Sequence, residues 1–378
     1  MGSISPPKSR FLHLSQVPLD PHYALKELFQ QDKHAKKVIL GSGLYRDDNC
    51  KPWVLPSVKS VPRDILLGPL SADVKECTVT LQTISGTGAN SLGARFLSEA
   101  LKPRCVWLSD PSWVNHQNIW SLAGVETKLY PYWNATKRIL DFSKMITTLE
   151  SQAAAGDVIL LHACAHNPTG VDPTKEQWER IADVCEDKGL FPFFDCAYQG
   201  FATGNLDEDA WAVRHFLERG TMEIAVAQSF SKNMGLYGER TGALHLVVAS
   251  SGAAGRVKGH LARLQRGSIS QPPTRGCKLA ATILNHEDLF KQWLSDLQAM
   301  SSRIQSMRDK LAAELARRGT PGDWSHIRTQ IGMFSYTGLT PDQVAHVQAN
   351  SHVYILKSGR ISVAGRRYSC ELVDVIIY

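Results

Sequence analysis

Five continuous apolar runs dominate the hydrophobic pattern of the central part of the chain. They occupy residues 105–110, 158–164, 190–196, 223–230 and 244–250. Each run has the length of a β-strand and lacks the alternation of a strand that has one face in water. We therefore expect strands that are covered on both faces, as in a largely parallel sheet.

Helical periodicity lies between and after these runs. Residues 174–189, TKEQWERIADVCEDKG, carry four residues on one helical face and end at Gly189. The four are Trp178, Ile181, Ala182 and Cys185. Strands that alternate with amphipathic helices indicate βαβ units. The pattern predicts an α/β fold, with a mostly parallel sheet and helices on both faces.

A longer amphipathic segment follows the last strand. From Leu289 to Leu315 apolar residues recur every three or four positions, and the segment ends at Arg317, Arg318 and Gly319. We interpret this stripe as a surface that packs on the core. The turn sequence GTPGDW at 319–324 then predicts a break. A smaller C-terminal unit is expected beyond it.

Composition and charge narrow the classes of partner. The 378 residues are 43% hydrophobic with a net charge of +6, and no Lys or Arg run has the length of a nucleic-acid tail or a lipid-binding patch. No apolar run has membrane length. We therefore expect no nucleic acid and no membrane, while anionic small molecules remain candidate ligands.

The eight cysteines indicate a reducing compartment. They form no CxxC pair and no dense framework, so we expect reduced thiols and a cytoplasmic location. We assign no metal ligands. The N-terminal stretch MGSISPPKSRFLHLSQ has no apolar core of a secretion signal.

Three polar residues follow predicted strands and suggest a common site. Asp195 ends the run LFPFF, Asn167 follows VILLHACAH, and Lys232 follows EIAVAQSFS. Ligands of open parallel sheets bind beyond the carboxyl ends of the strands. A carboxylate directly after an apolar strand is itself unusual. We therefore expect these three side chains to converge.

A glycine-rich turn supplies a possible anion site. SGTGAN at 85–90 leads into a predicted helix, whose first N–H groups and dipole favour a phosphate. A phosphate cradle, a lysine amine and a carboxylate for a pyridine nitrogen together describe a pyridoxal phosphate site. Ser229 and Arg240 would complete the phosphate contacts.

Longer sequence blocks carry a family resemblance. They are SGTGAN (85–90), DPSWVNH (110–116), HACAHNPTGVDP (162–173), SFSKNMGLYGERTG (229–242) and SGRISVAG (358–365). From about Phe11 to Gly365 the chain resembles the aspartate aminotransferases, class I pyridoxal phosphate enzymes of fold type I. The resemblance implies a large domain at 46–299 and a smaller α+β domain built from 11–45 and 300–378.

The resemblance also implies roles for individual residues around the cofactor. Lys232 would form the Schiff base and move the proton, Asp195 would bind the pyridine nitrogen, and Asn167 and Tyr198 the 3′-oxygen. The remaining cofactor contacts would come from Ser85, Gly86, Thr87, Trp113, Ser229 and Arg240, with His116 and His162 behind the ring. Taken alone, a tryptophan such as Trp113 is more often a core aromatic than a cofactor contact. The alternative for His116, His162 and the unassigned His166 is that they are interior histidines with satisfied hydrogen bonds.

Substrate selection would depend on two arginines. The resemblance implies that Arg360 pairs with the substrate α-carboxylate, and that Arg266 of the partner subunit in a homodimer reaches the distal carboxylate. Gly43, Trp113 and Asn167 would also contact the substrate. The expected substrates are L-aspartate and L-glutamate with their 2-oxo acids, in a ping-pong reaction. Arg266 is otherwise a solvated charge at a helix end.

The chain departs from the family pattern in two places. A helix-sized piece, with a tyrosine that contacts the partner's phosphate, is absent before Ile65, and residues 366–378 do not resemble the final family helix. Two alternatives to an aspartate aminotransferase therefore stay open. One is an aminotransferase recruited to another amino acid, aromatic or specialised; the other is a catalytically weakened homologue.

Overall fold

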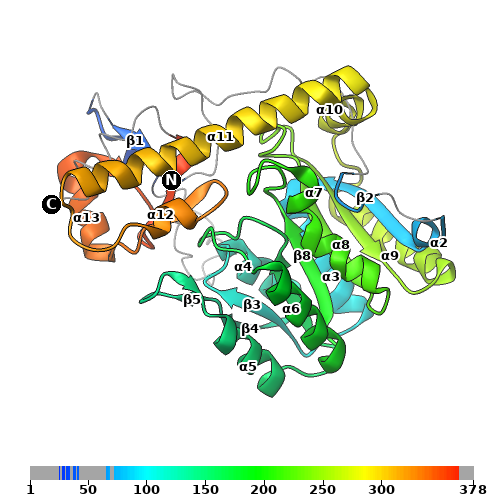
Figure 1. Cartoon of the computed structure of the whole chain (residues 1–378). Helices are drawn as coiled ribbons and strands as arrows, with labels where there is room; N and C mark the ends of the chain where they lie inside the picture. The colour runs from blue at the N-terminus through cyan, green and yellow to red at the C-terminus, as the bar shows by residue number, and fades with distance from the viewer. Residues whose placement is uncertain are drawn as a thin grey trace, which may run out of the picture.

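A computed structural model gives the fold of the chain (Figure 1). It describes residues 25, 28, 29, 31–34, 37–39, 41, 65–68 and 72–365. Gly43 and both departures from the family pattern, the stretch before Ile65 and residues 366–378, lie outside the described residues. Those expectations stay predictions.

A seven-stranded sheet forms the centre of the described part. Its order is β2 (Thr78–Ile84), β10 (Thr241–Val247), β9 (Ile224–Ser229), β8 (Phe191–Cys196), β7 (Val158–His162), β3 (Cys105–Asp110) and β4 (Glu126–Pro131). In this sheet β10 runs opposite in direction to the other six strands. The mostly parallel α/β fold is therefore confirmed.

The five predicted strands are present, and two edge strands were missed. The last predicted strand begins at Thr241, three residues earlier than expected. The missed strands β2 and β4 carry polar residues at several positions, such as Gln82 and Lys128, because they lie at the two edges of the sheet. A search for continuous apolar runs does not find strands of that composition.

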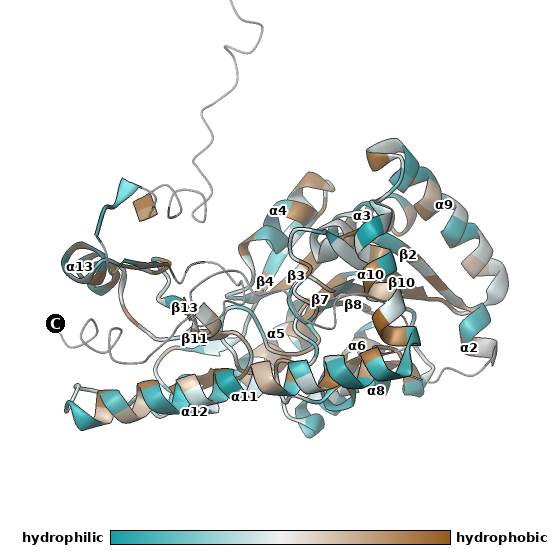
Figure 2. Cartoon of the chain, turned by 90° about the horizontal axis from the view of Figure 1, so that it is seen from above, coloured by the Kyte–Doolittle hydropathy of each residue, from teal (hydrophilic) through white to brown (hydrophobic). Residues whose placement is uncertain are grey.

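Helices cover both faces of the sheet, as Figure 2 shows from above. On one face, α3 (Ser85–Ala100), α4 (Val114–Leu122) and α9 (Ser251–Ile269) share a buried apolar cluster with the strands. On the other face lie α5 (Phe142–Gln152), α6 (Lys175–Lys188) and α8 (Trp211–Arg219). The helix predicted at 174–189 is α6, which a Thr174–Gln177 capping box begins and the left-handed Gly189 ends.

Shorter elements complete the chain. Those near the sheet are α2 (Ala72–Glu76), β5 (Trp133–Asn134), β6 (Ile139–Leu140), α7 (Leu206–Asp209) and α10 (Thr274–Asn285). Those of the second unit are β1 (Val38–Ile39), α12 (His326–Thr329), β11 (Phe334–Tyr336), α13 (Pro341–Ser351), β12 (Val353–Tyr354), β13 (Arg360–Ser362) and the 3₁₀ turn Val363–Gly365. Among the described helices, none is long and apolar enough to span a membrane.

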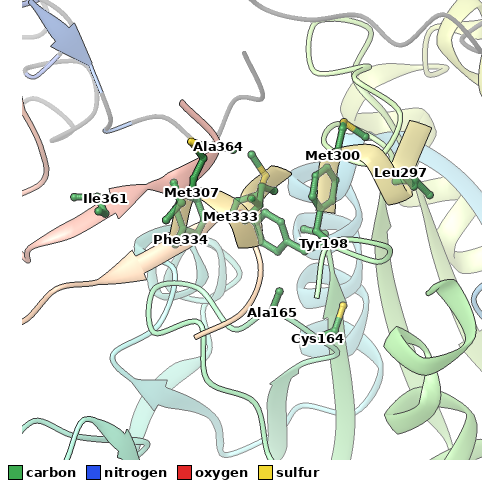
Figure 3. Close-up of a cluster of buried hydrophobic side chains, with 14 of the residues drawn as sticks. Cys164, Ala165, Tyr198, Leu297, Met300, Met307, Met333, Phe334, Ile361 and Ala364 are labelled. Atoms are coloured by element: carbon green, nitrogen blue, oxygen red, sulfur yellow. The ribbon is translucent and has the colours of Figure 1, made fainter. Parts of the chain in front are cut away.

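The long helix α11 (Glu287–Arg317) connects the sheet to this second unit (Figure 1). The apolar stripe expected from Leu289 onward packs in one buried cluster with side chains from both units. Figure 3 shows Met300 and Met307 of α11 beside Tyr198 and Phe334. Because α11 contributes to both units through one face, it fixes how the second unit lies against the sheet.

A buried arginine holds the second unit to α11. The guanidinium of Arg308 is fully buried and donates hydrogen bonds to the carbonyl oxygens of Ile327, Gly332 and Phe334. Burial lowers the pKa of Arg308 to about 9. Since these carbonyls precede or begin β11, Arg308 sets the path of the segment that carries Phe334.

We expect Arg308→Met to lower the free energy of unfolding by about 3 kcal/mol, because it leaves buried carbonyl oxygens without donors. Urea unfolding followed by far-UV circular dichroism measures this change. Arg256→Met on the exposed side of α9 is the matched control. Equal stabilities of the two variants would contradict the proposed anchoring.

Candidate functional site

Lys232 lies in the turn that follows β9, at the carboxyl end of the sheet. Its Nζ is 4.9 Å from the ring centroid of Tyr198 and 5.9 Å from that of Tyr237. Burial lowers the pKa of Lys232 to about 8; Asp195 acts in the opposite direction, and Arg240 and Arg360 add to the lowering. The amine is therefore nearer to neutrality at physiological pH than an ordinary lysine, as a Schiff-base nucleophile requires.

Asp195 is a buried carboxylate near the end of β8, held between two donors. Its Oδ2 accepts a hydrogen bond from Nε2 of His116 and its Oδ1 from Nδ2 of Asn90, both at 3.1 Å. Burial alone raises the pKa of Asp195, but the hydrogen bond and charge of His116, with His162 and Asn90, hold it below its usual range. The site thus keeps a buried negative charge.

A directed chain of hydrogen bonds leads to this carboxylate. Beyond the hydrogen bond from its Nε2 to Asp195, His116 has its Nδ1 2.9 Å from the Ser112 hydroxyl. The Ser112 oxygen then accepts from Nε2 of His162 at 3.2 Å, and Nδ1 of His162 accepts the Asn167 N–H. Burial lowers the pKa of His162 to about 3, so this ring is neutral and can donate from Nε2 while it accepts at Nδ1.

Hydroxyl groups gather at the first turn of α3. The Ser85 hydroxyl is 2.7 Å from that of Ser231 and 3.3 Å from that of Ser229. A Cβ added to Gly86 would meet the Ser229 Cβ at 2.8 Å, so only glycine allows this approach. No side chain caps the helix at Ile84. The first turn of α3 and these hydroxyls form a cradle that fits a phosphate.

Backbone strain marks the same place. Ser85 and Arg240 both have left-handed φ values, 63° and 52°, and the Ser85 N–H donates to the Arg240 carbonyl at 2.9 Å. Non-glycine residues in this region cost energy and concentrate at functional sites. The Arg240 guanidinium lies 5.5 Å from the Tyr237 ring, with its Nη1 donating to the Tyr237 carbonyl.

Arg360 is a buried cation that fits a carboxylate. It donates from Nη1 to the Asn167 Oδ1 and from Nη2 to the Gly41 carbonyl, both at 2.8 Å, and its carbon lies 4.0 Å from the Phe334 ring centroid. Burial lowers the pKa of Arg360 to about 10, and its buried Nε has no partner among the described residues. A buried guanidinium whose described hydrogen-bond partners are neutral oxygens favours an anionic ligand.

Asn167, which accepts a hydrogen bond from Arg360, also contacts Tyr198. Burial raises the pKa of the Tyr198 phenol, and a side-chain hydrogen bond with Asn167 acts against that shift. Trp113 is half-buried directly before α4, with its ring edge-on to His116 at 5.1 Å. Thr87 lies half-buried in the first turn of α3. The structure thus gathers these predicted residues at one edge of the sheet.

Arg266 lies apart from this group. It is exposed near the end of α9, and its Nη1 donates to the Ser270 hydroxyl at 2.8 Å. A residue supplied to the partner's site would be exposed in a single chain, so its position is compatible with the prediction and does not test it.

Four residues of the site were not predicted. They are Asn90, Ser112, Ser231 and Tyr237. Ser112 and Ser231 stand next to predicted residues in the same sequence blocks, and that adjacency was an available signal. Asn90 lies five residues into α3, where its sequence position gives no indication that it faces Asp195.

The residues present fit pyridoxal phosphate. The hydroxyl groups at the start of α3 fit its phosphate. The buried carboxylate of Asp195 fits its pyridine nitrogen, and Lys232, whose pKa is lowered, fits its aldehyde. The buried, partly unpaired Arg360 adds a place for a substrate carboxylate. The fold and site define a pyridoxal phosphate-dependent aminotransferase.

Comparison with known proteins supports this class. The model of the family "Aminotransferase class I and II" matches residues 66–371, so the chain belongs to that family. An aspartate aminotransferase of Medicago sativa is 44% identical over 94% of this chain and 91% of its own. An L-tyrosine:2-oxoglutarate aminotransferase of Aspergillus ustus is 44% identical over 93% of this chain and 74% of its own.

Solved structures of aminotransferases also resemble this chain. The cytoplasmic aspartate aminotransferase of Saccharomyces cerevisiae superposes with a TM-score of 0.92 at 38% identity, covering 97% of this chain and 98% of its own. An aromatic-amino-acid aminotransferase from Burkholderia pseudomallei, covalently bound to pyridoxal phosphate, gives 0.91 at 35% identity, covering 98% and 99%. The protein is a transaminase of the aspartate aminotransferase type, and its cofactor is pyridoxal phosphate.

The lowered pKa of Lys232 predicts its reactivity. In the cofactor-free protein, acetylation of Lys232 by limiting acetic anhydride should rise with pH around a midpoint of about 8, because only the neutral amine reacts. Quantitative peptide mass spectrometry measures the midpoint, and Lys232→Ala gives the blank. Asp195→Asn should move the midpoint lower still. A midpoint near the ordinary lysine value of about 10.4 would contradict the assignment.

Proposed function

We propose that the protein transfers the amino group between L-aspartate or L-glutamate and the corresponding 2-oxo acids. The observation that carries this proposal is Arg360, a buried guanidinium beside Asn167 whose hydrogen-bond partners among the described residues are neutral oxygens. A guanidinium held at that point binds the α-carboxylate of the substrate and so selects a 2-amino acid. The aspartate aminotransferases among the relatives support a dicarboxylic one.

When bound, pyridoxal phosphate supplies an aldehyde for the substrate nitrogen and a protonated ring that withdraws electrons from the α-carbon. The chain supplies the rest. Lys232 takes and returns the proton at the α-carbon, for which a pKa of about 8 is suited. Asp195 keeps its negative charge for the ring nitrogen, and Arg360 orients the α-carboxylate. In the ping-pong sequence the first 2-oxo acid leaves before the second enters.

Assembly and location are also part of the proposal. We propose a cytoplasmic homodimer in which Arg266 of one protomer faces the substrate of the other, in line with the exposed position of Arg266 in the single chain. We retain domain bounds of 46–299 for the large domain, and 11–45 with 300–378 for the small one. The six described cysteines are free thiols, which suits a reducing compartment.

A second substrate class has a specific observation in its favour. The tyrosine aminotransferase of Aspergillus ustus matches this chain as well as the plant aspartate aminotransferase does. An aromatic amino donor is therefore the second candidate.

A visible absorption spectrum tests the function directly. With pyridoxal phosphate added, the protein should show a band that Lys232→Ala lacks, and L-aspartate should shift that band to the amine form of the cofactor. A band that responds to L-tyrosine and not to L-aspartate would support the aromatic candidate. Absence of any Lys232-dependent band would indicate the weakened homologue and overturn the proposal.

Mixed dimers test the position of Arg266. Lys232→Ala and Arg266→Ala should each turn over aspartate poorly. After the two variants are unfolded together and refolded, aspartate turnover should recover, because one site of each mixed dimer then has its own Lys232 and the partner's intact arginine. Each variant refolded alone is the control. Without recovery, Arg266 does not act across the interface.

A further inference from the structure

Asn90 is a buried residue that the aminotransfer mechanism above does not use. Its side chain is 1% exposed, and its Nδ2 donates to the Asp195 Oδ1 at 3.1 Å and to the Gly86 carbonyl at 2.9 Å. One amide therefore links the carboxylate at the end of β8 to the first turn of α3. That turn forms the phosphate cradle.

The orientation of this amide is fixed by its neighbours. Both contacts of Nδ2 are acceptors, so exchanging the nitrogen and oxygen would place an oxygen against two oxygens. The Asn90 Oδ1 is buried and has no partner among the described residues. A helix interior gains nothing from an asparagine, and an apolar side chain would avoid the unpaired oxygen. The contact with Asp195 is the compensating interaction.

We propose that Asn90 is a positioning residue that keeps Asp195 ionised and at a fixed place relative to the phosphate cradle. The inference rests on the proposed role of Asp195 at the ring nitrogen. His116 donates to the other carboxylate oxygen, so a hydrogen-bond donor orients each oxygen of Asp195. Removing the Asn90 donor frees one of them and favours the protonated acid.

Other charged or titratable groups face Asp195 and must be held constant. They are His116 on α4, His162 on β7, and Tyr198 and Lys232 from the following turns. Their effects on the pKa of Asp195 are present in both the wild-type protein and an Asn90 variant. The difference between the two proteins at each pH therefore isolates the effect of the Asn90 amide.

The test measures non-covalent binding, since pyridoxamine and its 5′-phosphate cannot condense with Lys232. Titration calorimetry between pH 5 and 8 gives both affinities. In Asn90→Leu both should fall by the same factor, about ten- to a hundredfold at acidic pH for one charge-assisted hydrogen bond. The pH below which the affinity declines should be higher in Asn90→Leu than in the wild type, because an Asp195 carboxylate with a raised pKa is protonated at a higher pH. Asn90→Asp, which keeps the shape, should shift it in the same direction.

The controls separate this inference from the function it rests on. Asn118→Leu changes an exposed asparagine of α4 and should alter neither affinity. If Asp195→Ala still binds pyridoxamine as the wild type does, the assignment of Asp195 fails. If Asp195→Ala loses binding but Asn90→Leu has the wild-type pH profile, or loses only the phosphorylated ligand, Asn90 merely holds the helix start. Either result would overturn the proposal for Asn90.

Discussion

A buried negative charge at the end of β8 is the constraint on which the site depends. Asp195 is stabilised there by hydrogen-bond donors that reach it from two helices, His116 on α4 and Asn90 on α3. Each donor fixes a helix relative to the sheet. The cradle at the start of α3 and the aromatic Trp113 before α4 are therefore positioned by the same carboxylate that is proposed to face the ring nitrogen.

Two charges of opposite sign divide the site into two ends. Asp195 accepts hydrogen bonds from His116 and Asn90, whereas Arg360 lies over the Phe334 ring and its hydrogen-bond partners among the described residues are a carbonyl and an amide oxygen. Between them the pKa of Lys232 falls to about 8, because burial outweighs the attraction of Asp195. The arrangement places the proton-transfer group between a region suited to a cation and one suited to an anion.

Much of this was accessible from the sequence, for identifiable reasons. Parallel strands carry their polar residues to one edge, so Asp195 and Lys232 could be predicted to converge. The direction of β10 could not be predicted, because an apolar run has the same pattern in a parallel and in an antiparallel strand. Asn90 was missed because a polar residue inside a helix usually faces water. Arg308 was missed because burying an arginine with carbonyl partners leaves no mark in hydrophobic periodicity. Arg266 belongs to a proposed interface that a single chain cannot display.

The position of Arg360 in the chain has a consequence for biosynthesis. The cradle, Asp195 and Lys232 all come from residues 85–240, but the arginine that anchors to Gly41 follows some 120 residues after the cradle is complete. Because chains fold from the N-terminus as they leave the ribosome, the cofactor pocket emerges first. The residues that hold the cofactor therefore leave the ribosome well before the arginine that is proposed to hold the substrate carboxylate.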